Sequence, residues 1–275
     1  MRELLESYMP TNASAHGPAL DNLTVLIHWV MAILFVGWSL YFIYVLYRFR
    51  ASRNPRASYE GSKSHVHSYA EVGVAVVEVV LLIGFSIPLW SRWITPDHGT
   101  RPPLEIRVVS EQFAWNIHYP GPDGRFGRTD INLVSASNPL GIDPTDPNAA
   151  DDFNSVNQLH LEVNRPVVVL LSAKDVIHSF ALPVMRVKQD AIPGMEMPVY
   201  FTPVKTNNGE VWEIACAQLC GLGHYRMRGS MVVHTPEEFE KWLASNAPVP
   251  AVDAVTAPPT GVSEPVAEAP PEPVG

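Results

Sequence analysis

An uncharged apolar run from Leu23 to Tyr47 is the feature that most constrains how this chain can fold. A helix needs about 20 predominantly apolar residues to cross the hydrocarbon core of a bilayer, and the 25 residues of this run include no Lys, Arg, Asp or Glu. Residues 1–22 lack the basic start and the small-residue cleavage site of a secretory signal. We therefore predict a retained transmembrane helix at 23–47, rather than a cleaved signal or a buried helix of a soluble protein.

A second apolar run, from Tyr69 to Ile94, predicts a second transmembrane helix at 69–94. It contains Glu71 and Glu78, and ionisable residues at membrane depth usually face protein or water because they are costly in lipid. Pro88 lies near the far end of the run, where a kink disturbs the helix least.

The basic residues around the two runs predict their orientation. The connecting loop, 48–68, carries four Arg and one Lys, whereas residues 1–22 contain a single Arg. Cytoplasmic loops of membrane proteins carry an excess of Lys and Arg. We therefore predict a cytoplasmic loop at 48–68 and a periplasmic N-terminal segment at 1–22. The region after residue 95 is then exported, and both termini lie on the outer side of the membrane.

The exported region changes to short alternating or β-branched runs from about residue 103, which is typical of a β-sandwich or barrel. The stretch 136–157 is rich in Asn, Asp and Pro and predicts a long surface loop. The expected strands are Leu104–Val109, Phe113–Tyr119, Gln158–Val163, Val167–Ser172, Pro198–Thr202, Glu210–Ala215 and Ser230–His234.

One helix is expected at the end of this domain, which we place at 95–246. Thr235, Pro236 and Glu238 form the pattern of a capping box followed by a helix that runs to about Ser245. The remaining stretch, 247–275, is rich in Pro, contains four acids and no Lys or Arg, and is expected to be a disordered acidic tail.

The charge balance limits the partners of the chain. The net charge is −9, with 28 acids against 19 bases. A nucleic-acid-binding protein needs basic surface to neutralise phosphates, so that class is disfavoured. An acidic chain suits a partner with a basic docking face, because opposite fields speed the encounter.

Soft metal ligands gather in one loop. The two cysteines of the chain, Cys216 and Cys220, are followed by His224 and Met227, and His178 comes just after an upstream candidate strand. Thiolate and thioether are soft donors, and imidazole suits copper. The segment therefore predicts a metal site in the exported domain.

Three other interpretations of these residues compete with a pair of copper ions. A disulfide across so short a loop adds little stability. Zinc fits two Cys and two His, but it has no use for the thioether of Met227. A single blue copper takes one Cys, two His and an axial Met, which leaves one cysteine over. Two cysteines can instead bridge two copper ions, each with one His and one weak donor, namely Met227 or a loop carbonyl such as that of Gln218.

The loop CAQLCGLGHYRM, the upstream DVIHSF, the stretch VKQDAIPGM at Val187–Met195 and the two apolar runs resemble subunit II of cytochrome c oxidase. The resemblance covers roughly residues 20–245. The spacing C-x3-C-x3-H-x2-M is shared chiefly with the copper domain of nitrous oxide reductase, which lacks the two-helix anchor. The resemblance implies a two-helix transmembrane hairpin, an exported all-β domain with a cupredoxin-like Greek-key β-sandwich, and a dinuclear copper centre, CuA. The implied copper ligands are His178, Cys216, Gln218 through its carbonyl, Cys220, His224 and Met227.

The resemblance also implies a function. Soluble or tethered cytochrome c would give electrons to this chain, which would pass them to haem in subunit I. That subunit, with its haem and CuB, would reduce oxygen and pump protons across a bacterial inner membrane, whereas this chain alone would reduce no oxygen. Two alternatives are a membrane-anchored copper carrier or assembly factor, which binds one copper and releases it, and a quinol oxidase subunit II, whose relatives lack the copper ligands.

The chain departs from the family pattern at the loop between the cysteines. Gln218 stands where many relatives have a Glu that reaches a magnesium or manganese ion at the interface with subunit I. A neutral amide is a weaker ligand for a hard cation, so this departure disfavours a second metal. Asp190 can still contribute polar contacts there.

Further roles come from the same resemblance. Phe113 occupies the position of the family's electron-entry Trp and Trp115 follows it, although both aromatics can equally be core residues of the β-domain. Glu71 matches the family's proton-entry Glu when Pro88 is aligned with the Pro that ends the second span. The alternative is a Glu71 that merely extends to the membrane interface.

Overall fold

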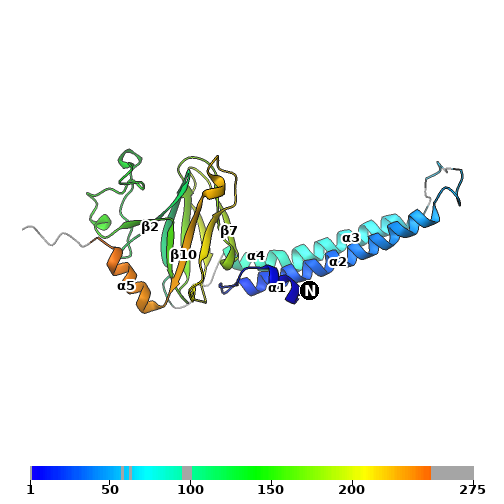
Figure 1. Cartoon of the computed structure of the whole chain (residues 1–275), viewed down its shortest axis with the longest axis horizontal. Coiled ribbons are helices and arrows are strands. Elements are labelled where there is room, and N and C mark those ends of the chain that lie inside the picture. The colour runs from blue at the N-terminus through cyan, green and yellow to red at the C-terminus, as the bar shows by residue number, and fades with distance from the viewer. Residues whose placement is uncertain (1, 57–58, 62–63, 95–100, 249–275) are drawn as a thin grey trace, which may run out of the picture.

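The computed structural model describes residues 2–56, 59–61, 64–94 and 101–248. It consists of a long helical hairpin attached to one side of a β-sandwich (Figure 1). Most of the expected acidic tail, 249–275, lies outside the described residues, as do 57–58 and 62–63 of the expected cytoplasmic loop.

The hairpin is formed by α2 (Gly17–Arg48) and by a second rod that comprises α3 (Val66–Leu81), a π-helical turn η1 (Leu82–Ser86) and α4 (Ile87–Ile94). Both rods are long and apolar enough to cross a membrane. The first begins at Gly17, earlier than the apolar run that predicted it. Pro18 suits the first turn of a helix, and Asp21 and Asn22 keep this part of the helix out of the apolar run.

The π turn has a cause in the sequence. Pro88 lacks a backbone N–H, and its ring crowds the carbonyl four residues earlier, that of Gly84. The π turn η1 contains Gly84 and ends two residues before Pro88, so the helix absorbs the proline by widening one turn and does not break.

The sandwich has two five-stranded sheets in the described part of the chain, with strand orders β3-β2-β1-β5-β8 and β4-β10-β9-β6-β7. The pairs β1–β5 and β10–β4 are parallel, so the chain crosses between strands that are distant in sequence. The predicted class, two apolar helices followed by an all-β cupredoxin-like sandwich, is confirmed. The strands are β1 (Leu104–Glu111), β2 (Ala114–Tyr119), β3 (Phe153–Val156), β4 (Gln158–Glu162), β5 (Val167–Ala173), β6 (His178–Leu182), β7 (Val187–Ala191), β8 (Met197–Phe201), β9 (Trp212–Cys216) and β10 (Arg228–His234).

Seven of the ten strands in the described residues were predicted, whereas β3, β6 and β7 were missed. In β5 every second residue, beginning with Val167, is buried between the sheets, as the alternation indicates. By contrast, β6 is buried at all five positions and β7 is mostly polar, so neither shows a period of two. The stretch predicted as one surface loop ends in β3 and is tied down through Asp152, whose carboxylate accepts hydrogen bonds from His118 Nε2 at 2.7 Å and the Gly127 N–H at 2.8 Å.

The final helix, α5 (Pro236–Asn246), begins with the predicted capping box. Thr235 Oγ1 accepts from the Glu238 N–H, and the Glu238 carboxylate accepts from the Thr235 N–H. The helix packs on the sheet through Trp242, whose ring stacks on His160 with centroids 4.1 Å apart. His160 Nδ1 lies 2.8 Å from His234 Nε2, so the two imidazoles share a hydrogen bond under the helix.

This histidine pair predicts a pH-dependent attachment of α5. Burial, together with the neighbouring His234, lowers the pKa of His160 to about 4. A group whose pKa is lower in the folded state than its unfolded value near 6.5 stabilises the fold above that value, and the stabilisation is lost as the pH falls. We expect the free energy of opening of α5 from the sheet to decrease by about 1–2 kcal/mol between pH 7 and 5. Amide hydrogen exchange of β4 and α5 measures it.

The variant His160→Phe, which keeps the stacking on Trp242 but cannot be protonated, should flatten this dependence. His65→Gln, at an exposed histidine before α3, serves as the matched control and should leave it unchanged. An equally steep dependence in His160→Phe would contradict the assignment.

Candidate metal centre

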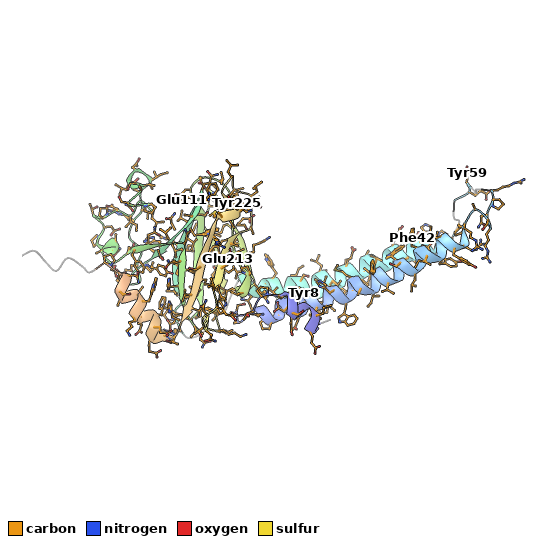
Figure 2. All side chains as sticks on the ribbon, viewed as in Figure 1. Tyr8, Phe42, Tyr59, Glu111, Glu213 and Tyr225 are labelled. Atoms are coloured by element: carbon orange, nitrogen blue, oxygen red, sulfur yellow. The ribbon has the colours of Figure 1, made fainter. Side chains whose placement is uncertain are left out.

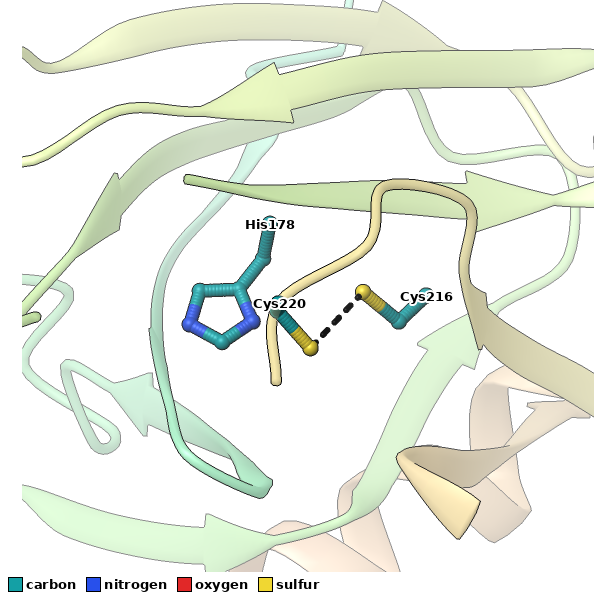
Figure 3. A group of neighbouring side chains, drawn as sticks. All are labelled: His178, Cys216 and Cys220. Carbon is teal, nitrogen blue, oxygen red and sulfur yellow. Dashed lines mark hydrogen bonds between the residues drawn. The ribbon is translucent and has the colours of Figure 1, made fainter. Parts of the chain in front are cut away.

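Two strands and one loop bring the predicted ligands together. His178 is the first residue of β6 and Cys216 the last of β9, and these strands are neighbours because Phe180 pairs with Cys216. The chain then turns through a loop that contains Cys220 and a short 3-10 helix, His224–Arg226, before β10 begins. The side chains of His178, Cys216 and Cys220 point toward one another (Figure 3).

The donor atoms converge on a small volume. One ring nitrogen of His178 and the sulfurs of Cys216 and Cys220 all lie within 4.8 Å of one another. Met227 Sδ is 3.1 Å from His178 Nδ1 and 3.7 Å from Cys220 Sγ, and His224 Nδ1 is also 3.7 Å from Cys220 Sγ. These sulfur and nitrogen donors form a soft ligand set, which suits copper.

Both cysteines are free thiols in the structure. Their sulfurs are 3.7 Å apart, well beyond the S–S bond length of about 2.05 Å. The carbonyl oxygen of Gln218 lies 3.2 Å from Cys216 Sγ, whereas the Gln218 side chain is exposed. The loop therefore turns a backbone carbonyl, and not the Gln218 amide, toward the sulfurs.

The side chain of Asp175 orients His178. The imidazole Nε2 donates to Asp175 Oδ1 at 2.9 Å, and Nδ1 is directed at Met227 Sδ. Metal-ligating histidines commonly donate their second ring N–H to a carboxylate in this way. Burial raises the pKa of Asp175, but hydrogen bonds from His178, Gln112 and Val176 outweigh that effect and hold the pKa below its usual range.

Gln112 links the same network to the cysteine loop. Its backbone N–H donates to Asp175 Oδ2 at 2.7 Å, and its side-chain Nε2 donates to the carbonyl of Cys220 at 2.6 Å. We missed both Asp175 and Gln112 as site residues in the sequence. Asp175 was within the DVIHSF motif, three residues before His178, and that spacing was the available signal.

The ring of Phe113 lies against the loop of residues 217–227 between β9 and β10, which we call the ligand loop. A Cβ at Gly223 would come within 2.4 Å of that ring, so glycine is required for the close approach. Phe113 is 39% exposed, whereas Trp115 is fully buried and packs edge to face against Phe180 and His178. The two aromatics therefore occupy different environments: one is at the surface of the loop, and the other is in the core behind it.

Burial also affects the thiols. Burial raises the pKa of Cys220 to about 11, and the neighbouring Cys216 adds to the effect. Without a metal the Cys220 thiol is therefore protonated at neutral pH. A cation that binds must displace that proton, so metal binding and proton release are linked.

The remaining residues with predicted roles lie elsewhere. Asp190 is exposed on β7, where it pairs in register with Ser179. Glu71 lies in the hairpin, about 10 Å along the helix axis from Glu78, and both line a groove of about 1090 Å³ between the two rods.

Comparison with known proteins identifies the family. The family model described as cytochrome c oxidase subunit II, periplasmic domain, matches residues 104–235. The alternative cytochrome c oxidase subunit 2 of Bradyrhizobium diazoefficiens is 30% identical over 226 residues, which cover 82% of this chain and 79% of that protein. This chain belongs to the cytochrome c oxidase subunit II family.

Other subunit II proteins match over different lengths. Cytochrome c oxidase subunit 2 of Cereibacter sphaeroides is 25% identical and covers 90% of this chain and 85% of its own length. That of Thermostichus vulcanus is 36% identical over 55% of this chain but only 36% of its own length. Among solved structures, the periplasmic domain of subunit II of cytochrome oxidase from Bradyrhizobium japonicum is 29% identical, with a TM-score of 0.39, and covers 53% of this chain and 94% of that one.

Membership in the subunit II family agrees with the rest of the molecule. The two apolar helices and a periplasmic-domain family fit a membrane protein with an exported domain. The family and the donor set of His178, Cys216 and Cys220 together suggest copper as the metal.

The hydrogen bond between Asp175 and His178 leads to a prediction. Asp175→Asn removes the charge that fixes the imidazole tautomer, and loss of such an outer partner typically weakens metal affinity about 10–100-fold. A competition titration with a copper chelator measures the change. Asp190→Asn, a matched substitution of an exposed acid, should leave the affinity unchanged. Equal affinities for the Asp175 and Asp190 variants would contradict the role of Asp175.

Proposed function

We propose that this chain is the electron-entry subunit of a proton-translocating cytochrome c oxidase. It accepts electrons from cytochrome c, soluble or tethered, and passes them to haem in subunit I, where oxygen is reduced. The observation that carries the proposal is the convergence of two free thiols with a buried imidazole and a buried thioether. A pair of copper ions bound there would supply a one-electron relay that needs little rearrangement.

The proposed ligands have separate tasks. The thiolates of Cys216 and Cys220 would hold the two ions, and His178 and His224 would each give one nitrogen. Met227 and the carbonyl of Gln218 would provide the weak donors. Zinc fits less well, because Met227 Sδ lies 3.1 Å from His178 Nδ1, inside the donor set, and zinc sites take Cys, His or carboxylate ligands.

The burial of the ligands favours a resident metal over the copper-carrier alternative. His178 is fully buried, and Cys220 and Met227 are 3% and 2% exposed. A protein that delivers its copper needs exposed ligands that a recipient can reach, whereas a relay gains from a rigid, shielded site. A quinol oxidase subunit II would need no copper ligands, and this chain has the full set.

The electron would enter near Phe113, which is partly exposed and whose ring packs against the ligand loop. Trp115 is packed behind it against the ring of His178. A second metal, magnesium or manganese, would be weakly held at the interface with subunit I. The Gln218 amide is neutral there, and Asp190 offers one carboxylate.

The membrane arrangement follows from the basic loop. We place the sandwich and both termini on the periplasmic side of a bacterial inner membrane, with 48–68 in the cytoplasm. Glu71 then lies near the cytoplasmic end of the second span, in a groove that also contains His67. There it can collect protons for a channel in subunit I.

The electron-entry role predicts the behaviour of a ligand variant. In the purified oxidase, Cys220→Ser should abolish rapid oxidation of reduced cytochrome c, because the metal site loses a bridging donor. Stopped-flow absorbance with reduced cytochrome c measures the fast phase. Ala217→Ser, which adds a hydroxyl group to the same loop without touching a ligand, should retain it. A normal fast phase in Cys220→Ser would overturn the proposal.

The proton-entry role is tested separately. Glu71→Gln should slow steady-state oxygen consumption by the assembled oxidase while leaving the fast oxidation of cytochrome c intact, because only proton delivery is impaired. Glu60→Gln, in the connecting loop, is the control and should behave as wild type. Full turnover in Glu71→Gln would reject Glu71 as the entry group.

A further inference from the structure

The segment before the first membrane helix is part of the exported domain. We call residues 10–16 the N-terminal strap. Ala13 is fully buried among the core residues of the sandwich, and Ser14 is 1% exposed. A segment that only preceded a membrane helix would have no reason to bury these side chains.

The strap is held by backbone hydrogen bonds like those of an added strand. The Ala13 N–H donates to Val184 at 2.9 Å, and the Ala13 carbonyl accepts from the Val204 N–H at 2.7 Å. The Ala15 N–H donates to Thr202 at 2.9 Å, and Ser14 forms a β-bridge with Pro203. The strap therefore joins the chain just after β8 to the turn between β6 and β7.

An ion pair completes this attachment. Asp21, in the second turn of α2, accepts from Arg186 through both carboxylate oxygens, at 2.8 and 3.3 Å. The two side chains are only 21% and 10% exposed, and a forked, shielded pair is stronger and more directional than an open surface pair. Arg186 also donates to the carbonyl of Pro10 at 2.9 Å, and Asn12 donates to Asp21 at 2.7 Å.

The position of Arg186 connects the membrane helix to the metal centre. Arg186 lies in the turn between β6 and β7, and His178 is the first residue of that same β6. On the other side, α2 continues from Asp21 without a break to Arg48. Figure 1 shows this end of α2 meeting the sandwich beside β7. The second covalent connection, after α4, runs through residues 95–100, which lie outside the described part of the chain.

We propose that the N-terminal strap and the Asp21–Arg186 pair fix the orientation of the exported domain on the membrane hairpin. They thereby set the distance from the metal centre to a partner in the membrane, and they do so without touching any proposed metal ligand. Domains joined by a small interface move relative to each other by default, and electron transfer slows steeply as the distance between donor and acceptor grows. Asp21 and Arg186 are thus positioning residues. The consequence for electron transfer rests on the proposed function, whereas the orientation itself does not.

The orientation can be measured on the full chain in nanodiscs without copper. Spin labels on noncanonical amino acids at Phe42 and Glu213, one on the hairpin and one on the sandwich (Figure 2), leave both cysteines untouched. Pulsed dipolar spectroscopy gives the distribution of distances between the labels. We expect one narrow distribution in the wild type and a width about twofold larger in Asp21→Asn and in Arg186→Gln, because the domain is then free to tilt.

Two further variants make the test specific. Arg186→Lys keeps the charge but loses the fork, so its width should lie between those of wild type and Arg186→Gln. Arg128→Gln breaks an exposed pair with Asp143 elsewhere on the sandwich and should keep the wild-type width. A wild-type width in Asp21→Asn and Arg186→Gln would overturn the proposal, as would equal broadening in the Arg128 control.

A second readout separates this proposal from the proposed function. In Asp21→Asn and Arg186→Gln the bound copper and its optical spectrum should match wild type, while electron transfer onward to haem in the assembled oxidase slows. If the chain binds no copper pair but the distance distribution still broadens in these two variants, the proposed function is rejected and the orienting role of the strap and the ion pair is retained. If the copper centre is normal and both the width and the onward transfer are unchanged in these variants, only the orienting role is rejected.

Discussion

The function proposed for this chain depends on two thiols held 3.7 Å apart next to a buried imidazole. One thiol ends β9, the other lies in the loop that leads to β10, and the imidazole starts the neighbouring strand β6. The sandwich thus converts ligands separated by about forty residues into one cluster, and it does so by ordinary strand pairing. Asp175 then orients the imidazole of His178, and Gln112 holds the loop through the carbonyl of Cys220. The ligands are therefore oriented before a metal binds.

Burial gives this cluster its chemical character. Away from water, the Cys220 thiol keeps its proton, with its pKa raised to about 11, so Cys220 is not an uncompensated thiolate in the metal-free site. A metal cation reverses this preference, because it pairs with the thiolates that burial disfavours. The charged carboxylate nearest to the site, that of Asp175, is already engaged by hydrogen bonds. The buried soft donors therefore suit a soft cation, and burial disfavours an ionised Cys220 in the metal-free site.

The sequence predicted the parts of the molecule whose signals are local. The apolar runs, the alternating strands, the capping box at Thr235 and the spacing of the cysteine loop each lie within a few turns or strand lengths of chain. Other features depend on contacts between distant residues. The five buried positions of β6 show no alternation. Ala13 is buried because its backbone forms hydrogen bonds with Val184 and Val204, which are distant in sequence. The sequence does not identify Asp175 as a site residue, because its role depends on where the ring of His178 points, which the spacing alone does not determine.

The proposed function requires that the sulfurs of Cys216 and Cys220 hold a pair of copper ions. Metal analysis combined with electron spin resonance on the purified full chain tests it most directly. We expect two copper ions per chain and, in the oxidised mixed-valence state that accepts an electron, a signal split by two equivalent copper nuclei that share one unpaired electron. A single copper with the splitting of one nucleus, a single zinc ion, or a disulfide between Cys216 and Cys220 in the native protein would contradict it.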